Sequence, residues 1–364
     1  MEGSIGGRVT AAELVLPCPE LEPTLAFFTD RLGFRLEAVF PAEAPAVAVI
    51  AGHGLRIRLE RGGPGSPGVL RLHGPGFGGG RELVAPNGTV VQLVQADPPL
   101  ELPPLSSSLV VTRLGDGASW GVGRAGMRYR NLLPDRLGGR FVASHIRIPD
   151  GGPVPDYVHY HGVRFQVIHC YRGWVRVVYE DQGPPFVLQA GDCVLQPPGI
   201  RHRVLESSPG LEVIEIGCPA EHETRVDHDL ELPTPRLRPG REFGGQRFVR
   251  HEAAGARWGP WRLAGYECRD SGIAAATGGL AGVRVIRPSG TAEEASLSHD
   301  GELLFHFVLE GSLVLRPAGH PAESLGPGDV FAVPAGLAHA LAEPSTDLEL
   351  LEVSLPAAVA LSFK

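Results

Sequence analysis

Three histidines of this chain have the types and spacing of a metal-ligand set. His159 and His161 lie two residues apart, and His202 lies further along the chain. Side chains two residues apart on a strand point to the same face, so His159 and His161 would project together into one interior, with His202 arriving from a neighbouring strand. Neutral imidazoles suit zinc, iron, copper and nickel, and the interior of a β-barrel can hold three of them around one ion.

Gln166 is the fourth candidate ligand, and it can add only a neutral carbonyl oxygen. Three histidines and one glutamine leave the full charge of a divalent ion exposed to whatever binds beside it. Such a site would favour anionic, chelating substrates. The alternative is that these four side chains are ordinary core residues, but inward polar groups without an ion would need other partners in a dry interior.

The sequence contains one internal repeat. The segment LEVIEIGCPA at 211–220 returns as LELLEVSLPA at 348–357, an offset of 137 residues. Further pairs recur at offsets of 137 or 138: Gly191-Asp192 and Gly328-Asp329, His202 and His339, Gly173 and Gly311, His161 and His299, and Trp120 and Trp258. One residue of slippage therefore aligns two copies of a single unit, at roughly 105–220 and 243–357.

The expected domain boundaries follow from this repeat. A stretch rich in Pro, Gly and Arg at 231–245 is typical of an exposed linker between the copies. We expect an N-terminal module at 1–104, a first barrel with the metal site at 105–230, and a linker with a second barrel at 231–364. Each copy consists of short alternating runs such as RFQVIHCY, separated by Gly and Pro, which indicate antiparallel barrels and a mainly β fold.

The first copy resembles the cupin superfamily, whose two motifs have the patterns G(x)5HxH(x)4E(x)6G and G(x)5PxG(x)2H. The corresponding positions are His159, His161, Gln166 and Gly173 in the first motif, and Gly191, Pro197, Gly199 and His202 in the second. Every spacing after the first histidine matches, although Gln166 stands where the family has its acidic ligand. The resemblance implies two barrels of the jelly-roll kind, with one divalent transition metal in the first barrel.

The second copy departs from this motif. Leu297 occupies the position of the first histidine and Leu304 the acidic position, so only His299 and His339 remain. His306 lies two residues beyond Leu304 on the same face of the strand and could supply a third imidazole. The alternative, which we favour, is a degenerate barrel that is kept for packing.

Residues 10–97 belong to neither copy. They contain a strand in AAELVLP, a helix in EPTLAFFTDRLGF, strands in AVAVIAG and LRIRLE, and a closing hairpin around Asn87-Gly88, which together give the order βαβββ. The runs LAFFTDRLGF and PNGTVVQL resemble one module of the vicinal oxygen chelate (glyoxalase-like) superfamily. Gln92 stands where that family carries a ligand glutamate. We therefore expect a structural, dimer-forming or substrate-covering role rather than a second catalytic metal.

Four further side chains of the first copy are candidates for lining the cavity or orienting the ligands and the substrate: Tyr157, Arg164, His145 and Glu215. An arginine beside the metal would suit a substrate carboxylate. We name Arg164, Tyr157 and Glu215 as candidate catalytic residues. Packing or surface roles are the alternative, and the recurrence of Glu215 as Glu352 indicates a structural part in both copies.

Composition excludes several classes of partner. The net charge is −8 and no cluster of Lys and Arg is present, so nucleic acid is not an expected partner. No apolar run approaches the length of about 18 residues that crosses a bilayer, and the start of the chain lacks the features of a signal peptide. The five scattered cysteines fit reduced thiols. We expect a cytoplasmic protein with a small-molecule substrate, and self-association as a homodimer is a reasonable expectation.

The resemblance leaves three functions open. The first is an Fe(II)-dependent dioxygenase, because three-histidine cupins include ring-cleaving and thiol-oxidising enzymes. The second is an isomerase, cyclase or lyase without redox chemistry, in which Zn, Ni or Mn polarises a carbonyl group or stabilises an enolate. The third is a protein that binds a small molecule without turnover. A barrel fold alone does not decide among them, and we favour the dioxygenase.

Overall fold

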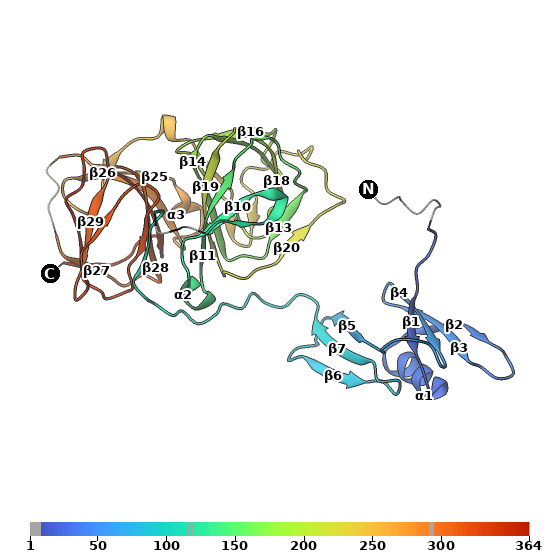
Figure 1. The fold of residues 1–364 in the computed structure, drawn as a ribbon. Coiled ribbons are helices and arrows are strands. Elements are labelled where there is room, and N and C mark those ends of the chain that lie inside the picture. Colours follow the sequence, from blue (N-terminus) through green and yellow to red (C-terminus); the bar gives the residue numbers. More distant parts are fainter. Residues whose placement is uncertain (1–8, 116, 118, 291–294, 364) are drawn as a thin grey trace. The chain divides into compact units, whose positions relative to one another are not determined.

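Strands dominate the computed structural model, so the predicted mainly β fold class is confirmed. The structure describes residues 9–115, 117, 119–290 and 295–363, and the chain divides into two units, 1–99 and 100–364 (Figure 1). Within these described residues, no helix has the length and apolar character needed to span a membrane.

The N-terminal unit contains a four-stranded sheet and one helical segment. Its strands are β1 (Leu14–Pro17), β2 (Arg35–Phe40), β3 (Val47–Gly52) and β4 (Leu55–Glu60), in the order β1-β4-β3-β2 with β1 parallel to β4. Between β1 and β2 lie the helix α1 (Leu21–Ala26) and a π-helical turn, η1 (Phe27–Arg31). One apolar core, which includes Phe28, Ile50 and Ile57, joins the helical segment to the sheet.

A second, three-stranded sheet completes this unit. It has the order β5-β7-β6 and consists of β5 (Val69–Gly74), β6 (Arg81–Val84) and β7 (Val90–Gln95). The strands predicted at 11–17, 46–52 and 55–60 are present as β1, β3 and β4, and the predicted helix is present as α1 and η1. The observed order differs from the prediction, because β2 follows the helical segment and the hairpin around Asn87-Gly88 belongs to this separate sheet. Neither β2 nor β5 was among the predicted strands. β2 leaves all of its residues exposed and therefore lacks the alternation that marks a half-buried strand.

The first barrel consists of two sheets packed face to face. Its strands are β9 (Gly121–Val122), β10 (Arg128–Asn131), β11 (Val142–Ile148), β12 (Gly152–Pro153), β13 (His159–His161), β14 (Phe165–Arg172), β15 (Trp174–Tyr179), β16 (Phe186–Gln189), β17 (Cys193–Leu195), β18 (His202–Ser207), β19 (Leu211–Cys218), β20 (Thr224–Val226) and β23 (Val249–His251). One sheet has the order β23-β17-β14-β19-β11-β10-β9. The other has the order β16-β15-β18-β13-β20, with β12 beside β18. The short helices η2 (Arg124–Gly126) and α2 (Arg136–Gly139) lie in its connections.

The second barrel repeats this architecture. Its strands are β8 (Val110–Thr112), β24 (Gly259–Pro260), β25 (Tyr266–Asp270), β26 (Gly282–Pro288), β27 (Leu297–His299), β28 (Leu303–Glu310), β29 (Leu313–Pro317), β30 (Glu323–Leu325), β31 (Val330–Ala332), β32 (His339–Ala342), β33 (Glu349–Leu355) and β34 (Leu361–Phe363). The sheets have the orders β24-β25-β26-β33-β28-β31-β8 and β30-β29-β32-β27-β34. The helix η3 (Ala253–Gly255) precedes β24, and the helix α3 (Ile273–Ala276) lies between β25 and β26. The linker forms a hairpin of β21 (Glu242–Phe243) and β22 (Gln246–Arg247).

The two barrels exchange their edge strands. β8 precedes the first barrel in the chain but pairs with β31 of the second, through Val111 and Phe331. β23 precedes the second barrel but pairs with β17 of the first, through Arg250 and Val194. The boundaries expected at 105 and 231 therefore separate the repeats along the chain, whereas in space each repeat supplies one strand to the other barrel.

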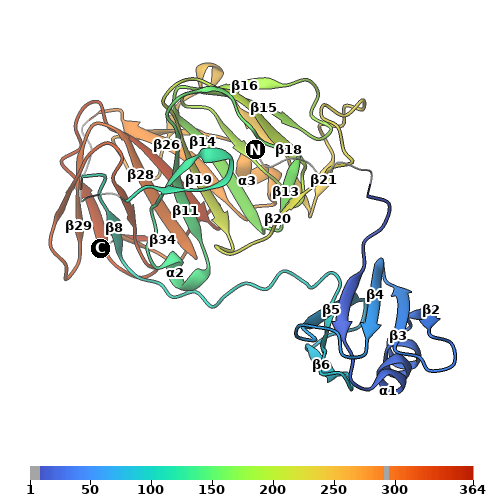
Figure 2. The same cartoon turned by 45° about the vertical axis from the view of Figure 1, so that its right-hand side comes forward.

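The barrels also share one apolar core. The two barrels lie side by side (Figure 2). Their shared core takes Phe165, Val167 and Ile214 from the first barrel and residues such as Phe305 and Phe307 from the second. On β14 the odd-numbered residues from 165 to 167 face this shared core. Because strand side chains alternate, the even-numbered residues of β14, beginning with Gln166, face the interior of the first barrel.

These exchanged strands and this shared core predict that the barrels fold together. A chain of residues 100–364 should unfold in one cooperative transition, whereas residues 100–230 alone lack β23, expose the shared core and should aggregate. Circular dichroism with thermal melting and size-exclusion chromatography of the two chains measure this. A folded, monomeric 100–230 chain would contradict the account.

Candidate metal centre

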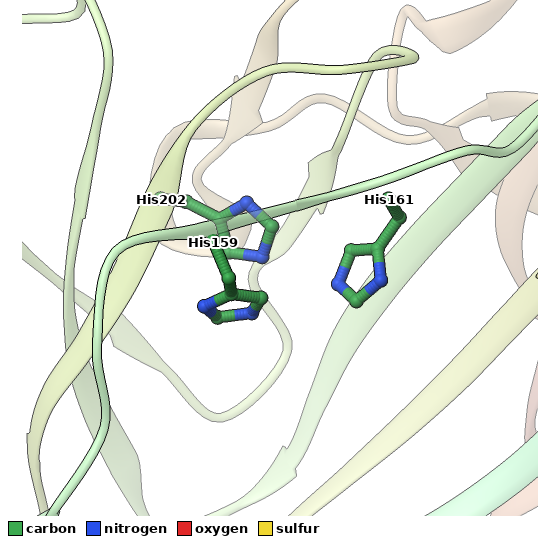
Figure 3. A group of neighbouring side chains, drawn as sticks. All are labelled: His159, His161 and His202. Carbon is green, nitrogen blue, oxygen red and sulfur yellow. The ribbon is translucent and has the colours of Figure 1, made fainter. Parts of the chain in front are cut away.

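The structure brings the three predicted histidines together inside the first barrel. β13 and β18 are neighbouring antiparallel strands in which His159 pairs directly with His202. The ligand atoms of His159, His161 and His202 all lie within 4.8 Å of one another, as expected for side chains that can share one ion (Figure 3). Among the residues that the structure describes, no other group of three or more His, Cys, Asp or Glu side chains comes this close.

Backbone hydrogen bonds determine which ring nitrogen each histidine offers. The Nδ1 atom of His159 lies 2.8 Å from the carbonyl oxygen of Tyr157, and Nδ1 of His202 lies 3.0 Å from that of Ile200. A carbonyl oxygen can only accept, so Nδ1 carries the hydrogen in both rings and Nε2 keeps its lone pair. The Nδ1 atom of His161 is likewise bonded, to the hydroxyl of Thr224 at 3.0 Å. The Nε2 atoms of His159 and His202 are therefore left for a ligand, and Nε2 of His161 is left in the same way when its Nδ1–H donates to Thr224, the arrangement that metal-binding histidines adopt.

Burial keeps these imidazoles neutral. Burial, together with the neighbouring His159 and His222, lowers the pKa of His161 to about 3. Burial is also the main cause of the lowered pKa of His159 and of His202, which lies well below the ordinary value. Since only the neutral ring can bind a metal, the three side chains are ready to bind without releasing protons at neutral pH.

Gln166 is buried in the wall of the same barrel, as the even-numbered positions of β14 require. Its Nε2 group donates a hydrogen bond to Oε1 of Glu215 at 2.6 Å, and its Oε1 atom has no hydrogen-bond partner in the described part of the chain. Nε2 of His159 is a second buried acceptor without a partner there. A buried acceptor without a partner is costly, and Nε2 of His159 belongs to a group of three histidines that line one cavity, so these residues fit a divalent metal ion. Gln166 is not among the residues that line this cavity. Whether Gln166 itself coordinates the ion stays a prediction.

Glu215 lines the cavity beside these ligands. Burial raises the pKa of its carboxyl group, an effect that the hydrogen bond from Gln166 opposes. A carboxyl group with a raised pKa, placed in a cavity next to candidate metal ligands, has the properties of a group that exchanges protons with a bound molecule.

The cavity of the first barrel has a volume of about 340 Å³. All three histidines line it, together with Glu215 and a majority of aliphatic side chains from both sheets, such as Ile146. This volume is within the range of about 300 to 1,000 Å³ that is typical of small-molecule sites.

The sequence analysis missed several residues of this cavity. Arg124, from η2, lines it, forms an ion pair with the fully buried Asp156, and places Nη1 at 3.4 Å from Nδ1 of His159. His222 also lines it, with its ring centroid 5.4 Å from that of His161. The repeat could have indicated Arg124, because Arg262 follows it at the same offset of 138 that relates Trp120 to Trp258.

Three of the other candidates lie outside the cavity and are corrected here. Arg164 forms an ion pair with Glu302 of the second barrel, at 3.0 Å. Tyr157 is 41% exposed and contributes its backbone carbonyl, not its hydroxyl, to the site. His145 alternates outward from the cavity-lining Ser144 and Ile146, and it is buried against Glu212 at 2.6 Å. Sequence position alone could not tell which face of each strand these side chains occupy.

The second candidate set is not assembled as a ligand group. Nε2 of His299 lies 2.9 Å from the carbonyl oxygen of Val333, and Nδ1 accepts a hydrogen bond from the backbone of Gly301. Both ring nitrogens are therefore used. The ring of His306 stacks on Phe331, and its Nε2 lies 3.3 Å from Glu352.

A buried charge cluster occupies the second barrel instead. Arg262, which corresponds to Arg124 in the repeat, pairs through two hydrogen bonds with Glu352, which corresponds to Glu215. Arg284 and His306 also contact this carboxylate. These positive groups outweigh the effect of burial and lower the pKa of Glu352 to about 2. The second barrel thus holds a guanidinium group beside Glu352, whereas the counterpart Glu215 in the first barrel is bonded to Gln166 and lines the same cavity as the histidines.

Comparisons with known proteins support the fold. A model of the cupin domain matches residues 283–354, in the second barrel. Salicylate 1,2-dioxygenase from Pseudaminobacter salicylatoxidans is 16% identical with a TM-score of 0.54, and the match covers 72% of this chain and 90% of that chain. Oxalate decarboxylase from Bacillus subtilis is 13% identical with a TM-score of 0.51, over 72% of this chain and 79% of that chain. The search of curated proteins gave no match.

At these identities the solved structures establish the fold alone. The family model indicates a cupin domain in the second barrel, in line with the expected resemblance, and the solved structures show that this chain shares the fold of these two proteins. The glyoxalase-like resemblance of the N-terminal unit stays a prediction.

Replacing single histidines tests the assignment of the metal to the first barrel. We expect about one transition metal ion per full-length chain, measured by mass spectrometry of the purified protein. His202→Ala should abolish binding, because it removes one of three converging Nε2 atoms. His339→Ala, its counterpart in the repeat, is the matched control and should leave the metal content unchanged. Equal loss in both variants, or no loss in either, would contradict the assignment.

Glu352→Gln tests the charge cluster of the second barrel. The change leaves the half-buried Arg262 without its counter-ion and should lower the free energy of unfolding by about 3 kcal/mol at pH 7. The folded-state pKa of Glu352 lies below the ordinary value of 4.5, so its contribution is present above that value and is lost as the pH falls toward 2. Urea unfolding of both proteins should therefore show a difference that shrinks between pH 5 and pH 3. A constant difference across this window would exclude the proposed ion pair as its cause.

Proposed function

We propose that the protein is a metal-dependent enzyme that acts on a small, anionic, chelating organic molecule in the first barrel, and that it is an Fe(II)-dependent dioxygenase. The observation that carries this proposal is the convergence of three Nε2 atoms on the wall of a cavity large enough for an organic substrate. Three protein ligands leave coordination positions for other molecules, which is typical of catalytic rather than structural metal sites.

The donor chemistry fits iron, although it fits zinc, copper and nickel as well. Imidazole nitrogens and an amide oxygen suit Fe(II), and no cysteine belongs to the ligand group in the described residues. A dioxygenase, the salicylate 1,2-dioxygenase named above, shares the fold.

The residues of the chain have separable roles in this scheme. When bound, Fe(II) would supply the redox chemistry that oxygen insertion needs. His159, His161 and His202 hold the ion, and the hydrogen bonds at their Nδ1 atoms fix the rings in place. Glu215 accepts or donates a proton at its carboxylate oxygen, and Gln166 orients that carboxylate. The aliphatic walls exclude water from the reacting groups.

A second function has one observation in its favour. Glu215, with its raised pKa, is a proton-transfer group placed next to a site for a Lewis acid, which an isomerase, cyclase or lyase without redox chemistry requires. Zn, Ni or Mn would serve this reaction, and the oxalate decarboxylase that shares the fold has Mn(II) centres.

Oxygen dependence separates these functions. The iron-loaded protein should consume oxygen with an aromatic or 1,3-dicarbonyl acid as substrate, followed with an oxygen electrode and by mass spectrometry of the product. Equal turnover under argon would select the Lewis-acid reaction, and tight binding without consumption of any candidate would select a binding protein.

Glu215→Gln tests the proton-transfer role. It should lower kcat by about 10² to 10⁴-fold, the usual contribution of general acid–base catalysis, while the metal content stays the same. Retention of full activity would exclude Glu215 from the reaction.

A further inference from the structure

The side chains that line the cavity of the first barrel change from polar to aliphatic along its strands. On β19, Glu215 pairs with Ser144 of β11, and the next inward pair along these strands is Val213 with Ile146. The pair after that is Leu211 with Ile148. All six side chains line the cavity. One wall is therefore polar at the level of Glu215 and aliphatic over the two following layers.

The opposite wall shows the same change. On β18 and β15, His202 pairs with Tyr179, and the next layer pairs Val204 with Val177. The aliphatic residues of the two walls belong to one apolar cluster, which includes Val177, Val213 and Ile146. The cavity consequently has a polar end at the histidines and an aliphatic end. Successive layers on a strand are about 7 Å apart, so two aliphatic layers give room for a body about the size of a phenyl ring.

Positive charge dominates the polar end once a metal is bound. A divalent ion and Arg124 supply three positive charges. Asp156 supplies one negative charge and Glu215 at most one. Asp156 is fixed by the backbone of Val204, which donates to its Oδ2 at 3.0 Å, and it holds Arg124 through Nη1. The Nε and Nη2 groups of Arg124 make no hydrogen bond to any described residue. They are available to a ligand, because the side chain lines the cavity and is 26% exposed.

We propose that the substrate is a chelating carboxylic acid with a hydrocarbon body, an inference that rests on the proposed function and specifies its substrate class. Arg124 binds the carboxylate through Nε and Nη2. One carboxylate oxygen and the adjacent oxygen of a 2-oxo or 2-hydroxy group would together chelate the metal that the three histidines would hold. The aryl or branched alkyl body fills the aliphatic end between Ile146, Val213 and Val177.

Two other substrate classes fit this cavity less well. A sugar acid would bury several hydroxyl groups against aliphatic side chains that offer no hydrogen bonds, which costs free energy for each unpaired group. A small diacid without a body would leave the aliphatic layers unfilled and forgo the favourable burial of apolar surface there.

A series of 2-oxo acids with one chelating head and different bodies tests this. The metal-loaded full-length protein is titrated by calorimetry with pyruvate, 4-methyl-2-oxopentanoate, phenylpyruvate and the methyl ester of phenylpyruvate. Phenylpyruvate should bind at least tenfold more tightly than pyruvate, with the branched acid between them, because each adds apolar surface to be buried. Equal affinities for pyruvate and phenylpyruvate in protein that carries its metal would overturn this inference and leave the proposed function standing. Absence of metal from the protein would overturn both.

Variants at each end of the cavity test which part of the substrate that end binds. Val213→Phe fills the aliphatic end, so it should weaken phenylpyruvate at least tenfold and leave pyruvate unchanged. Arg124→Gln should weaken the acid at least tenfold while changing the ester little. Arg128→Gln, which removes an equal charge from the exposed position Arg128, should change neither. Equal weakening of acid and ester by Arg124→Gln, at normal metal content, would show that Arg124 does not bind the carboxylate.

Discussion

The candidate metal centre depends on one constraint, the burial of three imidazoles whose Nδ1 atoms are already bonded. The carbonyl groups of Tyr157 and Ile200 accept the Nδ1 hydrogens of His159 and His202, so the Nε2 atoms of these two rings keep their lone pairs. Nε2 of His159 has no hydrogen-bond partner among the described residues. Burial prevents the rings from relieving this by protonation, since it lowers their pKa values. A metal ion is the group that satisfies three neutral nitrogen acceptors at once.

The same arginine and glutamate positions make different contacts in the two barrels. The repeat places an arginine and a glutamate at equivalent positions in both barrels, Arg124 with Glu215 and Arg262 with Glu352. In the second barrel the pair closes on itself, and both ring nitrogens of His299 are engaged by the backbone. In the first barrel Arg124 instead forms an ion pair with Asp156, and Glu215 accepts a hydrogen bond from Gln166. Arg124 therefore does not close on Glu215, and the cavity stays open. The exchange of β8 and β23 ties the open barrel to the closed one, so the second barrel supports the site without lining it.

Much of this could be predicted from the sequence, because spacing on strands is a local property. The HYH run and the repeat indicated the three histidines and the two barrels, and the apolar patterns of residues 10–97 indicated the N-terminal elements other than β2 and β5. Side-chain direction outside the motif was not predictable: Arg164 and His145 face the second barrel or the shared interface rather than the cavity. The exchange of edge strands, and the closure of Arg262 on Glu352, depend on contacts between residues far apart in the chain, which neither periodicity nor spacing encodes.

X-ray absorption spectroscopy of the metal-loaded full-length protein tests the central claim most directly, because it counts and identifies the donor atoms around the ion. The account predicts scattering from three imidazole rings, with nitrogen at about 2.0–2.2 Å, completed by oxygen donors. A spectrum that shows sulfur donors, or fewer than three imidazoles, would contradict it.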